Sequence, residues 1–390
     1  MRVCLDARCL RKTVTGLGRY AEQLIRGLAA IDRTTDYVVI LAKDYECQPV
    51  EQASFQIVRF GGRPDTLGNV LGGARKIAGL DADIFHSLHH FLPFGVRGRT
   101  VLTLHDFIWL DHPDLAYPNR WKGRVIQAYA SLALNYALRR ANHIIAISEH
   151  TARRARERMA PRIPEISVIP HGVDERFHRA AKRHASGFAT TEAPFFLVVG
   201  NSKPNKNVAR IVGAMALLVQ KVPEVRLRIV GRGEGYRELR SQVDSLGLTQ
   251  KVDFYGNVPD EELLDALQRA VALVFPSLVE GFGMPVLEAQ AVGCPVITSD
   301  RGVLPETAGD AALFVDPYDA WDIARAMETL YQDLPLRESL VRKGRERATR
   351  FTWEETARKT RHVYDLVMGQ SLPEFHAVRQ VLAPAAGVQA

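Results

Sequence analysis

Cysteine is scarce in this sequence, and long apolar runs are missing from it. The chain has four cysteines in 390 residues, at positions 4, 9, 47 and 294, with neither CxxC spacing nor the density of a disulfide scaffold. No stretch approaches the ~18 uninterrupted apolar residues of a membrane-spanning helix, and the charged start, MRVCLD, lacks the apolar core of a signal peptide. We therefore expect a cytoplasmic protein with reduced cysteines.

Acidic residues are outnumbered, which leaves a formal net charge of +7 and a pI near 9.3. Such a charge favours nucleic acid, an anionic membrane surface or phosphorylated substrates as partners. A nucleic-acid-binding surface needs basic residues interleaved with aromatics, but the segment from Arg139 to Arg158 has six arginines and no aromatic residue. We expect no nucleic-acid partner, and a basic, non-catalytic nucleic-acid-binding or membrane-surface protein remains the alternative function.

What the sequence does contain is a regular alternation of strand and helix patterns, with 46% hydrophobic residues to form a core. Predicted strands cover 1–5, 37–41, 55–58, 83–85, 100–104, 143–147 and 166–169 in the first half, and 195–199, 225–230, 252–255, 270–276, 296–298 and 312–315 in the second. Predicted helices include 20–31, 121–141, 208–220, 236–246, 261–269 and 321–332. This alternation predicts two α/β domains with doubly wound parallel sheets. The polar stretch 179–193 is the expected linker, and 370–390 an expected mobile tail.

Nine residues from Glu280 to Glu288 read EGFGMPVLE and follow a predicted buried strand. Glu280 is expected in a loop at the carboxyl end of that strand, and Glu288 on the first turn of the helix that Pro285 begins. Gly281 and Gly283 let the backbone approach a ligand, and the helix N-terminus directs N–H groups to the same place. Two carboxylates around an anion-binding helix terminus suit a sugar nucleotide. A solvated acidic helix start is the alternative, because the helix dipole alone favours Glu there.

Two further loops have the composition of phosphate-binding segments. Gly16 and Gly18 lie between the first predicted strand and helix, where a doubly wound fold binds anions. Lys203 and Lys206 lie between a strand and a helix in the second half, which suits a diphosphate leaving group. The alternatives are an ordinary tight turn for the glycines and a solvated loop for the lysines.

His105 and Asp106 follow a predicted strand, so they are expected to point into the cleft between the domains. A cap or a buried hydrogen bond is the alternative for this pair. His86, His89 and His90 lie nearby and raise the question of a metal site. No cysteine or carboxylate completes a recognisable spacing, and adjacent histidines on a strand chelate poorly. We therefore expect no metal ion.

Residues 231–235 read GRGEG after a strand and resemble part of a dinucleotide-binding fingerprint. The last glycine comes too early, and Asp253 opens a strand where the fingerprint needs an acidic residue at a strand end. An NAD-dependent oxidoreductase is therefore not favoured.

The EGFGMPVLE segment resembles the signature of the retaining glycosyltransferases of family four, which have the GT-B fold. The resemblance covers nearly the full chain, from Gly16 through His105 and Lys206 to the LPE segment that starts at Leu304. It implies two facing Rossmann-like domains with the donor site in the cleft. Residues 1–178 would form the acceptor-side domain and residues 194–350 the nucleotide-sugar-binding domain. Segment 351–369 looks like the family's last helix, which crosses back to the N-terminal domain.

The resemblance also implies roles for single residues. Glu288 would hold the ribose hydroxyls of the donor, and Glu280 would hydrogen-bond the sugar near its reacting carbon. Lys206 would contact the donor phosphates, with Lys203 in place of the arginine that many members carry at the position of Asn201. His105, expected to be catalytic together with Glu280 and Lys206, would contact the donor sugar or phosphate. The other residues expected at the donor site are Asp106, Gly16, Gly18, the backbone of Phe282, Gly283 and Met284, and Gly231, Asn257 and Val258.

Within the family, the chain looks most like bacterial mannosyl- and related hexosyltransferases of surface-polysaccharide assembly. The resemblance therefore implies retaining transfer of a hexose, with GDP-mannose favoured as donor, to a glycan or lipid-linked acceptor. No cofactor and no metal ion are expected. Because family members often elongate lipid-linked glycans, the segment from Arg139 to Arg158 is either a solvated arginine face or a contact with the inner face of the membrane.

Overall fold

The fold is that of a computed structural model, which describes residues 1–12, 15–116, 120–160, 164–181, 193–231, 233 and 235–369. The expected mobile tail, residues 370–390, lies outside the described residues, as do residues 182–192 of the expected linker.

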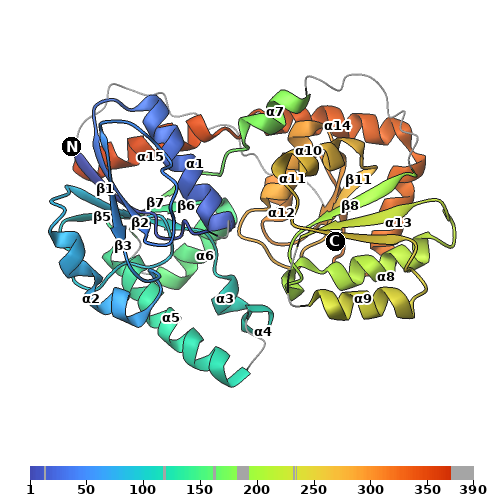
Figure 1. The fold of residues 1–390 in the computed structure, drawn as a ribbon, viewed down its shortest axis with the longest axis horizontal. Helices are drawn as coiled ribbons and strands as arrows, with labels where there is room; N and C mark the ends of the chain where they lie inside the picture. The colour runs from blue at the N-terminus through green and yellow to red at the C-terminus, as the bar shows by residue number, and fades with distance from the viewer. Residues whose placement is uncertain are drawn as a thin grey trace.

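Within the described ranges the strands form two parallel sheets, one in each half of the chain (Figure 1). The first has seven strands in the order β3-β2-β1-β4-β5-β6-β7: β1 Arg2–Asp6, β2 Asp36–Ala42, β3 Phe55–Phe60, β4 Ile84–Ser87, β5 Arg99–Leu104, β6 His143–Ala146 and β7 Glu165–Val168. The second has six in the order β10-β9-β8-β11-β12-β13: β8 Phe195–Val199, β9 Arg226–Val230, β10 Val252–Gly256, β11 Ala272–Phe275, β12 Val296–Ser299 and β13 Leu313–Val315. All the strands expected from the sequence are confirmed, with ends that differ by at most two residues.

Helices cover the faces of both sheets (Figure 1). The helices of the first half are α1 Gly16–Ile31, α2 Leu67–Ala78, α3 Ile108–Asp111, α4 Pro113–Ala116, α5 Arg120–Arg140 and α6 Glu149–Met159. Those that follow are α7 Glu175–Ala181, α8 Val208–Leu218, α9 Tyr236–Ser245, α10 Asp260–Arg269, α11 Met284–Val292, α12 Leu304–Ala308, α13 Ala320–Gln332, α14 Leu334–Ala348 and α15 Trp353–Met368. Helix α7 extends into the stretch expected as linker, because Phe177 and Ala180 are buried in the core of the second domain.

Both sheets reverse their strand order once, between β1 and β4 in the first and between β8 and β11 in the second. In an open parallel sheet, the loops at the carboxyl ends of the strands beside such a switch point form a crevice. The segments after β1, β4, β8 and β11 contain Gly16, His89, Lys206 and Glu280. The topology therefore places the expected site residues at the crevices of the two sheets.

The last helix, α15, packs in the core of the first domain, although it follows the second in sequence. Trp353, Ala357 and Tyr364 are buried there, and Figure 1 shows α15, in red, beside α1. Just before the helix, the carbonyl oxygen of Phe351 accepts a hydrogen bond from the N–H of Val173 at 3.0 Å. The chain thus crosses between the domains twice, along neighbouring paths.

Candidate active site

Glu280 is paired with a lysine from the neighbouring strand's loop. Its Oε1 lies 2.7 Å from Nζ of Lys206, at the end of the 3₁₀ turn Pro204–Lys206 after β8. Asn207, in a left-handed conformation with φ of 59°, fixes this turn by donating from Nδ2 to the carbonyl oxygen of Pro276 at 3.0 Å. Two adjacent strand ends therefore present a carboxylate and a cation side by side. This pairing suits a ligand that carries both hydroxyls and phosphates.

The Glu280 loop is in close contact with the first domain. A Cβ on Gly281 would lie 2.8 Å from the carbonyl oxygen of His105 and 3.1 Å from Cβ of Asp106, so only glycine fits without movement. A cavity of about 480 Å³ opens beside this contact. Its lining includes Asp106 and Arg153 from the first domain and Glu280 from the second. The cavity is large enough for a small ligand.

Glu288 is buried on α11 and held by an arginine of the first domain. Its Oε1 lies 2.9 Å from Nη1 of Arg19, while Nη2 of Arg19 lies 2.9 Å from Oδ1 of Asp260. Burial raises the pKa of Glu288, and the charge of Arg19 opposes that shift. Sequence reasoning missed Arg19. Its place directly after Gly18 was a signal, but nothing in the sequence links it to α11.

Gly16 and Gly18 lie in the first turn of α1, not in a loop before it. Thr15 caps the helix, with its Oγ1 accepting from the N–H of Gly18 at 3.1 Å. A Cβ on Gly18 would lie 3.4 Å from the carbonyl oxygen of Cys9, whereas a Cβ on Gly16 would have no atom within 4 Å. Packing therefore accounts for Gly18 but leaves the surface above Gly16 open.

Phe282, Gly283 and Met284 form the start of α11. Gly283 takes the left-handed φ of 96° that the N-cap position requires here, and Met284 is the first helical residue. Pro285 is thus second in the helix, one residue later than expected. Phe282 is buried against the ring of His171, with ring centres 4.9 Å apart. Because of this anchor, the N–H groups at the start of α11 occupy fixed positions near Glu280.

His105 and Asp106 follow β5 and lie on the interdomain side of the first domain. Nε2 of His105 lies 3.1 Å from the carbonyl oxygen of Leu88, and burial lowers the pKa of this histidine well below its ordinary value. The imidazole is therefore neutral at pH 7. Burial raises the pKa of Asp106 to about 6, opposed by the N–H of Ile108 and the charge of Lys203. Asp106 lines the cavity with Glu280, whereas His105 does not.

Gly231, Asn257 and Val258 do not line the 480 Å³ cavity. Gly231 has φ of 143°, and a Cβ there would overlap the carbonyl oxygen of Gly200, so the close approach of two loops accounts for this glycine. Val258 lines a second cavity of about 420 Å³ on the second domain, together with Tyr255 and others. Asn257 is exposed.

The histidines near β4 have separate packing roles. His86 is buried between the hydroxyls of Tyr364 and Thr103, at 2.7 Å and 2.8 Å. Nε2 of His89 lies 3.3 Å from Oδ2 of Asp6. Burial lowers the pKa of His86 and of His90 to about 3. In the described part of the chain, no group of three or more His, Cys, Asp or Glu side chains is arranged to hold a metal ion.

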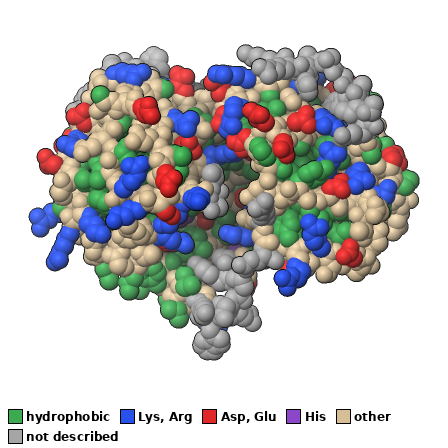
Figure 2. Space-filling model, in the orientation of Figure 1, with side chains coloured by type: hydrophobic (Ala, Val, Ile, Leu, Met, Phe, Trp, Pro, Cys, Tyr) green, Lys and Arg blue, Asp and Glu red, His purple; other side chains and the backbone are tan. Residues whose placement is uncertain are grey.

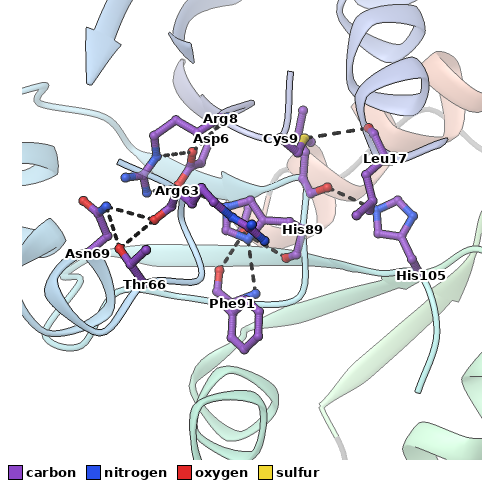
Figure 3. A network of polar contacts seen from close by, with 12 residues as sticks. Asp6, Arg8, Cys9, Leu17, Arg63, Thr66, Asn69, His89, Phe91 and His105 are labelled. Carbon is purple, nitrogen blue, oxygen red and sulfur yellow. Dashed lines mark hydrogen bonds and ion pairs between the residues drawn. The ribbon is translucent and has the colours of Figure 1, made fainter. Parts of the chain in front are cut away.

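A buried ion pair beneath the first switch point was not expected from the sequence. Asp6, at the end of β1, accepts hydrogen bonds from Nε of Arg8 at 2.8 Å and from its Nη2 at 2.6 Å. Both side chains are almost fully buried, and Figure 3 shows His89 pointing toward them. Burial alone would raise the pKa of Asp6, but the bonds and charge of Arg8 outweigh it and hold that pKa well below its ordinary value.

Five of the six arginines from Arg139 to Arg158 have partners within the chain. Nη2 of Arg140 donates to the carbonyl oxygens of Val96 and Gly98, at 2.8 Å and 2.9 Å. Asp111 of α3 pairs with Arg154 and Arg158 of α6, and within α6 a carboxylate oxygen of Glu149 lies 3.7 Å from Arg156. Helix α6 also contributes five residues to the lining of the 480 Å³ cavity: His150, Thr151, Arg153, Arg154 and Glu157. Helix α6 thus faces the cleft.

Comparison with known proteins gives relatives that match nearly end to end. The chain is 27% identical to O-antigen chain mannosyltransferase B of Escherichia coli, over 94% of this chain and 100% of that protein. It is 30% identical to a glycogen synthase of Mycobacterium tuberculosis, over 90% of this chain and 91% of that protein. The names of these two relatives thus refer to different reactions, the transfer of mannose in one and the synthesis of glycogen in the other.

A solved structure shows the same fold. The Anabaena protein HepE, in complex with UDP and glucose, superposes with a TM-score of 0.70 at 19% identity, over 94% of this chain and 100% of that one. The family model described as Glycosyltransferase Family 4 matches residues 14–177, and the model described as Glycosyl transferases group 1 matches residues 180–347. The chain therefore belongs to the glycosyltransferases of family four and has their GT-B fold.

Proposed function

We propose that this chain transfers a hexose, with mannose favoured, from a nucleotide-diphosphate sugar to a glycan or lipid-linked acceptor, with retention at the anomeric carbon. The observation that carries the proposal is that one loop and helix present two carboxylates, each paired with a cation: Glu280 with Lys206 and Glu288 with Arg19. Carboxylates accept strong hydrogen bonds from hydroxyls. Glu280 would therefore hold the sugar and Glu288 the ribose.

Lys206 would stabilise the departing diphosphate. As the bond between the anomeric carbon and the phosphate oxygen breaks, negative charge grows on that oxygen, and a fixed ammonium group lowers the energy of this state. In the proposed same-face reaction, the acceptor oxygen bonds to the anomeric carbon and its proton passes to the leaving phosphate. Because Lys206 supplies the positive charge, we propose that neither a metal ion nor another cofactor is required.

We favour GDP-mannose as the donor, supported by the mannosyltransferase among the relatives. The glycogen synthase relative and the UDP complex of HepE make UDP-glucose the first competitor to test. We propose that the reaction takes place in the cytoplasm. In the ranges that the structure describes, no helix has both the length and the apolar character that crossing a bilayer requires.

Thermal unfolding in the presence of GDP, UDP, dTDP and ADP, and of their sugars, tests the proposal. A ligand that binds only the native state raises the unfolding midpoint as its concentration rises. We expect a shift with one nucleotide that is lost in Glu288→Ala. NMR of the product then reports whether the anomeric configuration of the donor is kept. No shift with any nucleotide in folded protein, or an inverted product, contradicts the proposal.

A further inference from the structure

Exposed apolar side chains cluster on two helices and one turn of the first domain. Twelve large hydrophobic side chains are exposed in the described part of the chain, and six of them belong to this cluster: Leu67 and Leu71 on α2, Phe94 after β4, and Val125, Ile126 and Leu132 on α5. Leu71 is 59% exposed, Val125 72% and Leu132 70%. Figure 2 shows hydrophobic side chains along the lower edge of this domain, where Figure 1 places α2 and α5. Scattered apolar residues are ordinary on a surface, whereas a cluster indicates an interaction site.

The turn at Phe94 joins α2 and α5 into one surface. The N–H of Phe94 donates to the carbonyl oxygen of Val70 in α2 at 2.6 Å. The ring of Phe94 stacks on Tyr136 of α5, with ring centres 4.0 Å apart. Near the start of α2, the hydroxyl of Tyr129 in α5 donates to the carbonyl oxygen of Asp65 at 3.1 Å. The exposed residues of the two helices are therefore parts of a continuous face.

The two helices of this face have no acidic residues: neither α2 nor α5 contains an aspartate or a glutamate. Helix α2 has Arg75 and Lys76 in its last turn, and α5 has Arg139 in its last turn, all of them exposed. Leu67, Leu71 and Arg75 follow one another at intervals of four, so apolar and basic side chains share one outer side of α2.

We propose that the α2–α5 face, formed by Leu67, Leu71, Phe94, Val125 and Leu132 with Arg75, Lys76 and Arg139, docks on an anionic lipid bilayer. The apolar side chains would enter the boundary between headgroups and acyl chains, and the basic side chains would meet anionic headgroups. A second copy of the chain fits less well, because a twofold contact would press these two helices, which have basic but no acidic residues, against their copies and bring like charges together.

The proposal places the membrane contact away from α6, whose arginines are paired within the chain or line the cavity. Only Arg139 belongs both to the α2–α5 face and to the segment that the sequence suggested. Docking on the membrane requires only the outer surface of the first domain, so it is independent of which donor the protein binds.

Co-sedimentation of the full chain with vesicles tests the proposal. We expect binding to vesicles of phosphatidylcholine mixed with phosphatidylglycerol, weaker binding to phosphatidylcholine alone, and weakening with added salt, because screening acts on exposed charges. The double variant Leu71→Glu, Leu132→Glu should lower the vesicle-bound fraction about tenfold, since each glutamate would be repelled by anionic lipid and would place a charge in the apolar boundary. The matched control is Trp321→Glu on α13, where the side chain is 66% exposed on the other domain, and it should bind like the wild type.

Because these side chains lie on the surface, we expect the variants to have the same unfolding midpoint as the wild type. An equal midpoint shows that a variant is folded. Failure of the wild type to bind anionic vesicles overturns the proposal, as does undiminished binding of the double variant. Analytical ultracentrifugation tests the alternative occupant. If the wild type forms a dimer, the double variant does not, and the wild type does not bind vesicles, then the face binds a second copy of the chain and the membrane proposal is overturned. The nucleotide titrations are independent of all these outcomes.

Discussion

Arg19 on α1 and Glu288 on α11 join the two domains across the cleft, with Nη1 and Oε1 2.9 Å apart. The carboxylate is buried, and the guanidinium also contacts Asp260 at the start of α10. The residue expected to hold the donor ribose is therefore oriented by the domain expected to bind the acceptor. If Glu288 holds the ribose as proposed, donor binding would depend on a contact between the two domains.

Replacement of Arg19 tests that relationship. In Arg19→Met the pKa of Glu288 should rise further, because burial already raises it and Arg19 opposes the rise. We expect the nucleotide affinity to fall about tenfold or more, since hydrogen bonds to charged groups contribute about 1.5–3 kcal/mol, and to fall further at pH 6 than at pH 8. Calorimetric titration at both pH values measures this, with Arg19→Lys as the control that keeps the charge. Tighter binding by Arg19→Met would show instead that Arg19 occupies the position of the ribose.

Gly16 and Gly231 should respond differently to the same substitution. Gly16→Ala meets no atom within 4 Å and lies in a helix, so the free energy of unfolding should stay the same or rise by up to ~1 kcal/mol. Its nucleotide affinity should nevertheless fall if the diphosphate approaches this turn. Gly231→Ala places a Cβ on a backbone with φ of 143° and against Gly200, so it should destabilise the protein by about 3 kcal/mol. Urea unfolding and nucleotide titration separate the two effects, and unchanged affinity in Gly16→Ala would remove this turn from the donor site.

Gly281→Ala should keep the domains from closing. The added Cβ would lie 2.8 Å from the carbonyl oxygen of His105, across the domain boundary. We expect kcat to fall on the order of a hundredfold, because a misplacement of about 1 Å can have that effect, with nearly unchanged stability. Small-angle scattering should show a larger radius of gyration. The control is Gly213→Ala in α8, where a Cβ meets nothing within 4 Å; a Gly281→Ala enzyme as active as this control contradicts the prediction.

Removing one partner of the Asp6–Arg8 pair should lower the free energy of unfolding more than replacing both partners with apolar residues. Arg8→Met leaves Asp6 buried without its cation, which typically costs about 3–5 kcal/mol, whereas an apolar pair can be neutral. The double variant Asp6→Leu, Arg8→Met should therefore recover much of the loss in urea unfolding at pH 7. Because the pKa of Asp6 is lowered in the folded state, the stability from this pair is present above the ordinary aspartate pKa and is lost as the pH falls below it. Additive losses in the double variant would show that the two residues act independently.

Asp106 should make the folded state less stable as the pH rises. Its pKa of about 6 lies above the ordinary value, so the folded state binds the proton more tightly than the unfolded state does. Stability from the neutral carboxyl is complete below about pH 4 and is lost as the pH passes 6. Asp106→Asn keeps an acceptor for the N–H of Ile108 but cannot ionise, so its stability relative to the wild type should increase from pH 5 to pH 8. A difference that does not change with pH contradicts this prediction.

The strands, the order of the elements and the family could all be predicted from local sequence patterns. Buried parallel strands are continuous apolar runs, which a local pattern reveals, and EGFGMPVLE marked one strand end and helix start without structural help. Helix α2 was missed because three glycines in twelve residues weaken its local signal. A tertiary hydrogen bond, from the N–H of Phe94 to the carbonyl oxygen of Val70, ties it to the segment after β4.

Which side chains contact one another could not be predicted from the sequence. Arg19 and Glu288 are 269 residues apart in sequence, and Lys206 and Glu280 are 74 apart, so no local pattern connects them. Gly231 was expected at the donor site, but the structure shows a steric reason for this glycine in the approach of Gly200. The arginines of α6 looked free in the sequence, whereas folding pairs two of them with Asp111. The reason is physical: strand and helix patterns depend on near neighbours, whereas ion pairs and close backbone contacts depend on distances that exist only after the domains have packed.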